Sequence, residues 1–260
     1  MLLAIDIDNK FTKFGIFNFD QMLDSFSIVT DKNRSIEETK LTIKLILLDK
    51  KINLSDIDDI IISSVVPELS IRYEEISQKI TNKKPILISS GVKTGLNIKC
   101  ESPKEVGSDR IIRAVAASKT YDGDIIVISA SSITTVDYIN SKKEFLGGLI
   151  LPGIDLFEDS LHRQSAKLPQ VEIKKSDKFL GNNTISSIQS GIYYGYQNAV
   201  LGIVNNIVDQ YELKKSNTVI LTTGLHSDLL INSKFDIKKD TTLGLNGLKY
   251  IYELNKNNLK

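Results

Sequence analysis

At 260 residues, with 41% of them hydrophobic, the chain is long enough to fill one large core or two modest ones. Its 33 basic and 32 acidic residues nearly cancel, so no overall field would draw it to nucleic acid or to an anionic membrane. The single cysteine, Cys100, excludes an internal disulfide. The first residues lack the features of a signal peptide, and no apolar run approaches the roughly 18 residues of a membrane span. We therefore expect a cytoplasmic protein with no nucleic-acid or membrane partner.

The first third of the chain alternates between strand-like and helix-like patterns. In chain order it predicts strands at 2–8, 11–18 and 24–29, a helix at 35–49, a strand at 59–65, a helix at 68–81 and a strand at 85–89. The run DDIIISSVVP is continuously apolar at its centre, which is typical of a strand buried on both faces beside parallel neighbours. The expected unit is therefore βββαβαβ.

The rest of the chain repeats this pattern. It predicts a helix at 104–120, three strands within DIIVISASSITTVDYINSKKEFLGGLILPG, helices at 153–166 and 184–213, a strand at 218–223, and helices at 225–231 and 241–255. Both LLAIDIDNKFTKFGIF and DIIVISASSITTVDYI set a short polar turn between two strands. We predict an α/β fold of two similar lobes with a cleft between them, residues 1–118 forming the first lobe and 119–260 the second.

Asp6 and Asp8 alternate with apolar residues at the end of the first predicted strand, so their carboxylates can share one face. Two carboxylates together attract Mg²⁺, which proteins hold through one or two of them plus substrate phosphates. An ordinary strand end that caps its own turn explains the pair equally well.

The segment GSDRIIRAVAA leads through Gly107 and Ser108 into a helix whose first turn carries Asp109 and Arg110. An acid at a helix N-terminus commonly complements the helix dipole. An aspartate followed by an arginine is also what positioning and deprotonating a small acidic alcohol requires. From the residues alone, the structural interpretation is slightly favoured.

Three further segments could contact a nucleotide. SASSITT at 129–135 offers several hydroxyl donors, GGLILPG at 147–153 allows close backbone approach, and Thr222, Thr223 and Gly224 end a strand just before a helix. Ordinary strands and tight turns account for each of them as well.

Taken together, these segments resemble the type III pantothenate kinases, and the resemblance runs in order along nearly the whole chain. It rests on AIDIDNKFTKFGIF, ISSVVPEL, ESPKEVGSDRIIRAVAA, GGLILPGI, SAKLPQVEI, NNTISSIQSGIYYGY and VILTTGL. The resemblance implies two RNase H-like lobes of the acetate and sugar kinase, heat-shock ATPase and actin superfamily. It also implies a homodimer that phosphorylates pantothenate from ATP with Mg²⁺ and a monovalent cation, K⁺ or NH₄⁺, as the first step toward coenzyme A.

The resemblance also implies roles for individual residues. Asp109 would take the proton of the substrate hydroxyl, and Asp6 would hold Mg²⁺. The remaining expected contacts are Gly107, Ser108, Arg110 and Thr184 for pantothenate, and Ile7, Asp8, Asn9, Lys10, Ser132, Thr134 and Thr135, together with Asp6, for the nucleotide.

Several positions depart from the family pattern, mostly on the nucleotide side. Asp8 and Ser131 replace glycines, Lys10 and Thr223 also differ, and Ser129 replaces the acid that serves the monovalent cation. Phosphoryl transfer depends on positioning and electrostatics, so two functions stay open. One is an active pantothenate kinase. The other is a weak or silent relative with a binding or regulatory role, or one that pairs with an active paralogue.

Overall fold

The computed structural model describes residues 1–165, 167–176, 178–231 and 234–256, and the chain divides into two compact units. Unit 1 consists of Met1–Gly95, Ser102–Ala116 and Thr242–Lys260, and unit 2 of Leu96–Glu101 and Ala117–Thr241. The predicted lobe boundary at 118 and 119 stays a prediction. The packing adds that the C-terminal segment belongs with the first unit.

Unit 1 is built on a five-stranded sheet of order β3-β2-β1-β4-β5. Its elements are β1 (Leu2–Ile7), β2 (Phe11–Asn18), β3 (Gln21–Val29), α1 (Ile36–Asp49), η1 (Leu54–Asp56), β4 (Asp59–Ser64), α2 (Pro67–Thr81), β5 (Ile86–Leu87), η2 (Pro103–Glu105), most of α3 (Ser108–Thr120) and α6 (Leu243–Asn255). β1 pairs antiparallel with β2. It pairs in parallel with β4, and this parallel pairing is what the continuous apolar run of residues 59–65 predicted. β1 is buried along its whole length.

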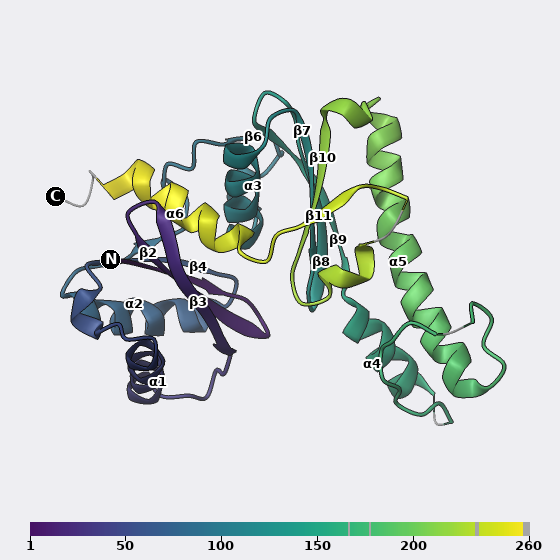
Figure 1. Cartoon of the computed structure of the whole chain (residues 1–260), viewed down its shortest axis with the longest axis horizontal. Helices are drawn as coiled ribbons and strands as arrows, with labels where there is room; N and C mark the ends of the chain where they lie inside the picture. Colours follow the sequence, from purple (N-terminus) through teal and green to yellow (C-terminus); the bar gives the residue numbers. More distant parts are fainter. Residues whose placement is uncertain (166, 177, 232–233, 257–260) are drawn as a thin grey trace. The chain divides into compact units, whose positions relative to one another are not determined.

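The two faces of this sheet are covered by different helices, which explains why side chains on both faces of β1 are buried (Figure 1). Leu3, Ile5 and Ile7 point into a core that includes Ile43 of α1 and Leu69 of α2. The alternate residues face α6. There a Cβ at Gly244 would lie 3.1 Å from the Asp6 carboxylate, and one at Gly247 only 1.9 Å from the carbonyl of Ile112 in α3, so both glycines permit close packing of α6.

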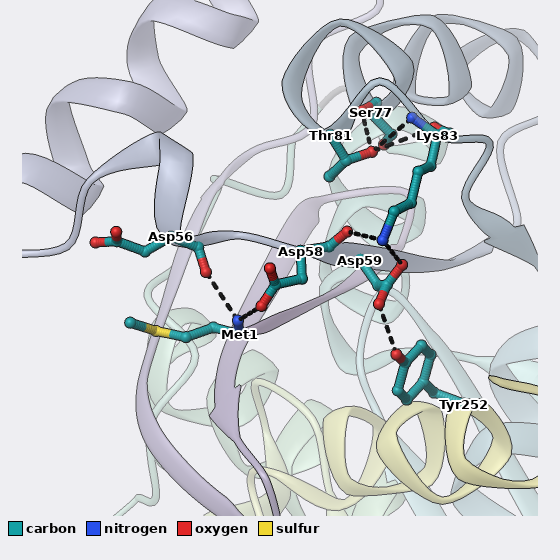
Figure 2. Close-up of polar contacts among 8 residues, drawn as sticks. All are labelled: Met1, Asp56, Asp58, Asp59, Ser77, Thr81, Lys83 and Tyr252. Atoms are coloured by element: carbon teal, nitrogen blue, oxygen red, sulfur yellow. Dashed lines mark hydrogen bonds and ion pairs between the residues drawn. The ribbon is translucent and has the colours of Figure 1, made fainter.

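Asp59, the first residue of β4, links α6 to the end of α2 (Figure 2). Its carboxylate accepts a hydrogen bond from the Tyr252 hydroxyl of α6 (2.8 Å) and an ion-paired one from Lys83 Nζ (3.0 Å). Burial, and then the bond to Asp59, raise the pKa of Tyr252 above its usual value, so the phenol stays a proton donor. This contact joins segments that lie far apart in the sequence.

We expect Asp59→Asn to lower the free energy of unfolding by about 1–3 kcal/mol, because it removes a charged acceptor from the partly buried Tyr252 hydroxyl and the ion-pair partner of the exposed Lys83. The control is Asp58→Asn, whose carboxylate is 72% exposed and pairs with the amino group of Met1. That exposed pair should contribute less than about 1 kcal/mol. Urea denaturation of both variants compares them, and equal losses would contradict the structural role of Asp59.

Unit 2 is built on a six-stranded sheet of order β11-β10-β7-β8-β9-β6. Its elements are β6 (Asn97–Ile98), the end of α3, β7 (Asp124–Ala130), β8 (Ile133–Ile139), β9 (Glu144–Pro152), α4 (Ile154–Gln164), α5 (Thr184–Gln210), η3 (Lys215–Asn217), β10 (Thr218–Thr223), η4 (Ser227–Leu230) and β11 (Ile237–Lys239). α5 begins with a complete capping box at Asn183. Its Ile192, Tyr196 and Val200 pack against Ile126 and Ile128 of β7.

The two sheets follow the same plan, as the sequence predicted. The unit 1 sheet has the order β3-β2-β1-β4-β5, and five strands of the unit 2 sheet, listed in the opposite direction, have the order β9-β8-β7-β10-β11. β7 thus corresponds to β1, and β8 to β11 correspond in turn to β2 to β5. β6 is an additional strand that pairs in parallel with β9. The α/β class with two related units is therefore confirmed, and each unit has one polar turn between its first two strands.

Two predicted helices differ from the structure. The helix expected at 104–120 begins only at Ser108, because Pro103–Glu105 forms a separate 3₁₀ turn. The helix expected at 225–231 is a single 3₁₀ turn, Ser227–Leu230, since so short a segment forms too few bonds to offset helix nucleation. Within the described ranges, no helix combines the length and apolar character needed to cross a bilayer.

Candidate active site

The predicted site residues fall into two groups, one in each unit. Unit 1 contains Asp6, Ile7, Asp8, Asn9, Lys10, Gly107, Ser108, Asp109 and Arg110, and unit 2 contains Ser129, Ser132, Thr134, Thr135 and Thr184. Residues 6–10 span the end of β1 and the turn to β2, and residues 129–135 span the turn between β7 and β8, whereas Thr184 begins α5.

In unit 1 the turn is a tight hairpin that begins at Asp8. The Asp8 N–H donates to the Phe11 carbonyl (3.1 Å), and the Asp8 carboxylate accepts from the N–H of Asn9 (2.7 Å). Thr30 at the end of β3 donates its hydroxyl to the Asp8 carbonyl (2.8 Å). These bonds fix the backbone of the turn and leave the side chains of Asn9 and Lys10 on the exposed side of the hairpin.

The N-terminus of α3 is held at the same edge of the sheet. The Ser108 hydroxyl donates to the carbonyl of Ser64, and the Ser63 hydroxyl donates to Ser108 Oγ, each at 3.1 Å. Ser63 lies beside Asp6 in the parallel pairing of β4 with β1. The carboxyl ends of β1 and β4 and the first turn of α3 therefore meet, as is usual for ligand sites in α/β sheets.

Asp109 is oriented by an ion pair that the sequence prediction missed. Its Oδ2 accepts from the guanidinium of Arg113 at 2.7 Å, and the Arg113 side chain is only 6% exposed. Burial alone would lower the pKa of Arg113, but the carboxylates of Asp109, Asp6 and Asp8 raise it, so the guanidinium stays charged. The spacing of four residues on one helix was the signal that could have revealed this pair.

The other Asp109 oxygen lies over Gly107. A Cβ on Gly107 would come within 2.6 Å of Asp109 Oδ1, so a larger residue there would displace the carboxylate. The Gly107 carbonyl accepts from the N–H groups of Arg110 and Ile111 at 3.1 Å each. Gly107 therefore begins the helix and makes room for the acid at the same time. Arg110 is partly buried in the first turn.

Asp6 is the least satisfied carboxylate of unit 1. It is 4% exposed, and its Oδ1 has no hydrogen-bond partner among the described residues. Burial raises its pKa from 3.8 to about 6; Arg113 opposes this shift, and Asp109 and Asp8 add to it. A buried carboxylate oxygen without a partner fits a hard cation such as Mg²⁺, whose remaining ligands would be phosphate oxygens and water. Among the described residues no cluster of three or more acidic, His or Cys side chains forms a fuller metal cage.

In unit 2 the corresponding turn is Ala130–Ser132, between β7 and β8. Ser131 and Ser132 are partly exposed, whereas Ser129 is 2% exposed. The hydroxyl of Thr134 shares a 2.7 Å hydrogen bond with Tyr196, and that of Thr135 donates to Asp137 at 3.2 Å. Both threonine hydroxyls are thus bonded within the unit, so the partly exposed serines are the side chains most available to a ligand.

Thr184 occupies the first position of α5 and is exposed. Phe179, Leu180 and Ile185 nearby in the chain are also exposed, at 65%, 80% and 54%. These three exposed apolar side chains lie close in sequence to the start of α5.

Comparison with known proteins gives a consistent result. The family model for type III pantothenate kinase matches residues 2–206. The chain is 38% identical over 257 residues to a type III pantothenate kinase of Exiguobacterium sibiricum, covering 98% of this chain and 100% of that one. It is 39% identical to one of Geobacillus sp., covering 98% of both. In fold it is similar to a ROK hexokinase from Thermus thermophilus, with a TM-score of 0.57, 10% identity and 99% coverage of both chains.

Proposed function

The chain belongs to the type III pantothenate kinase family, and on that premise we propose that it transfers the γ-phosphoryl group of ATP to the hydroxyl of pantothenate. The products are 4'-phosphopantothenate and ADP. The single observation that carries the proposal is the Asp109 carboxylate, held by Arg113 at 2.7 Å at the edge where the β1 and β4 strands end. A carboxylate fixed in this way is suited to accept a proton from an alcohol.

We assign the following roles to the residues around the pantothenate hydroxyl. Asp109 accepts the proton of the pantothenate hydroxyl while the new bond to phosphorus forms and the bond to ADP breaks. Arg113 holds the Asp109 carboxylate in one orientation through their ion pair. Gly107, Ser108, Arg110 and Thr184 are the proposed pantothenate contacts, with Arg110 paired to the substrate carboxylate.

Asp6 is the proposed anchor for Mg²⁺, on the strength of its unpartnered buried oxygen. The metal, when bound, neutralises charge on the phosphate oxygens. The turns at Asp8–Lys10 and Ser131–Ser132 are the proposed phosphate contacts, through backbone N–H groups and the Lys10 and Ser132 side chains. Ser129, neutral and buried, supplies no carboxylate for a monovalent cation, so turnover is proposed to be independent of K⁺ and NH₄⁺.

The proposed assembly is a homodimer, supported by the exposed Phe179, Leu180 and Ile185 beside α5. The proposed compartment is the cytoplasm, because ATP is a cytoplasmic metabolite.

The test is the initial rate of pantothenate-dependent ADP formation with millimolar ATP and Mg²⁺, measured with and without K⁺ or NH₄⁺. We expect a rate that needs pantothenate and changes less than about twofold with the monovalent cation. A rate that appears only with K⁺ or NH₄⁺ would contradict the role given to Ser129. No rate, combined with pantothenate binding in a calorimeter, would contradict kinase activity and favour a silent, regulatory relative.

A further inference from the structure

Two glycine-containing segments of unit 2 pack closely against the Ala130–Ser132 turn. On one side, the Gly153 N–H donates to the Ser132 carbonyl at 3.1 Å, and a Cβ on Gly153 would lie 2.0 Å from the Ser131 carbonyl. On the other, Gly224 has a φ of +96°, and a Cβ there would lie 2.5 Å from the Ala130 carbonyl. No other residue type fits at either position without moving the turn.

In each of these segments, a residue with an ionisable side chain lies two positions after the glycine. Asp155 lies in the first turn of α4, two residues after Gly153. His226 lies two residues after Gly224, and its N–H donates to the Ala130 carbonyl at 2.9 Å. The backbone of His226 is therefore hydrogen-bonded directly to the turn.

The two side chains meet. His226 Nε2 lies 3.0 Å from Asp155 Oδ1, and the side chains are only 19% and 33% exposed. The contact is at ion-pair distance but outside hydrogen-bond geometry, since Nε2 has no hydrogen-bond partner among the described residues. The turn is therefore bonded to both segments, and the two segments contact each other through the His226 and Asp155 side chains.

We propose that His226 and Asp155 are a positioning pair, which holds the Ala130–Ser132 turn in the conformation that receives the nucleotide phosphates. The inference rests on the proposed kinase function for its ligand, but the contacts themselves do not depend on that function. Without the pair, the 153–155 and 224–226 segments lose this direct side-chain contact, and the turn between them gains freedom that phosphate binding must then remove. Since the His226 backbone is bonded to the turn, loss of the pair should weaken nucleotide binding selectively.

The test compares His226→Ala, Asp155→Asn and the double variant with Asp228→Asn. Asp228 forms an ion pair of similar length, 2.7 Å, with Lys239 in the same unit, but that pair joins η4 to β11 and does not reach the turn. Asp155→Asn keeps the shape of the side chain, which guards against a general folding defect in the histidine variant. Two readouts are used: amide hydrogen exchange in the peptide spanning 126–135, and KM for ATP and for pantothenate.

We expect exchange at the turn to be roughly two- to fivefold faster in both single variants, and no faster in the double variant than in either single variant. This is the size expected for loss of a side-chain contact that is not fully buried. KM for ATP should rise by a similar factor, while kcat and KM for pantothenate stay within about twofold. Asp228→Asn should change none of these.

Unchanged exchange at the turn, an equal change in Asp228→Asn, or a parallel rise in both KM values would overturn the proposal. If the wild-type protein forms no pantothenate-dependent ADP, the proposed function fails. Hydrogen exchange still decides the role of the pair in that case, because it needs no turnover.

Discussion

Asp109→Asn is expected to lower kcat by roughly 10²–10⁴-fold, the usual contribution of a positioned general base. Asparagine keeps the size of the side chain and can still accept from Arg113, but it cannot take a proton from the pantothenate hydroxyl. KM for ATP should change little, because the loss is confined to a step that comes after binding. Steady-state kinetics with each substrate varied in turn would measure both effects.

Glu105→Gln is a suitable control for this variant. Glu105 lies four residues before Asp109, in the 3₁₀ turn that precedes α3, and its side chain is exposed and acidic. Its substitution should therefore leave kcat within about twofold. If Asp109→Asn retained more than about a tenth of the wild-type kcat, Asp109 would not be the base, and the Asp109–Arg113 pair would have a structural role only.

Asp6→Asn is expected to abolish most activity and yet to make the folded protein more stable at neutral pH. The Asp6 carboxyl has a pKa near 6 in the folded chain against 3.8 when solvated, because burial penalises its charge. A shift of about 2 units corresponds to about 3 kcal/mol. Since the folded-state pKa is raised, the protonated group favours folding below about pH 4, and this contribution is lost as the pH rises through about 6.

The difference in unfolding free energy between Asp6→Asn and wild type should therefore grow from near zero at pH 4 to about 3 kcal/mol at pH 7.5 in favour of the variant. Denaturant titrations at several pH values would measure it. Asp122→Asn, at an exposed position, should show no such growth. If the difference in unfolding free energy did not change with pH, burial would not raise the pKa of Asp6. That result would weaken the assignment of Asp6 as the magnesium anchor.

Much of the fold follows from the sequence because its strongest signals are local. The apolar run around Ile61 predicted a buried parallel strand, and the structure pairs β4 in parallel with both β1 and β5. The repeated pattern predicted two related sheets, which the strand orders confirm. The two-residue strand β6 and the three-residue strand β11 were missed, because so few residues show no periodicity and depend on a neighbouring strand for their conformation.

The site was less accessible to sequence reasoning, since it depends on contacts between distant segments. Asp109 and Arg113 are neighbours on one helix, so their pairing could have been read from the sequence. Nothing local joins Asp155 to His226, which meet only because β9 and β10 end beside the same turn. The burial of Asp6 is likewise a consequence of α6, whose Gly244 packs against it.

The position of α6 in unit 1 has a consequence for how the chain folds during synthesis. The ribosome produces Met1–Gly95 early, but α6, which covers one face of the unit 1 sheet, follows only after the whole of unit 2. At usual translation rates that delay is roughly 7–30 s. Until then the α6-facing side of β1, which includes Asp6, stays open to water or to a chaperone. Unit 2 is continuous apart from β6 and can complete its core first, so the unit encoded first is the last to finish folding.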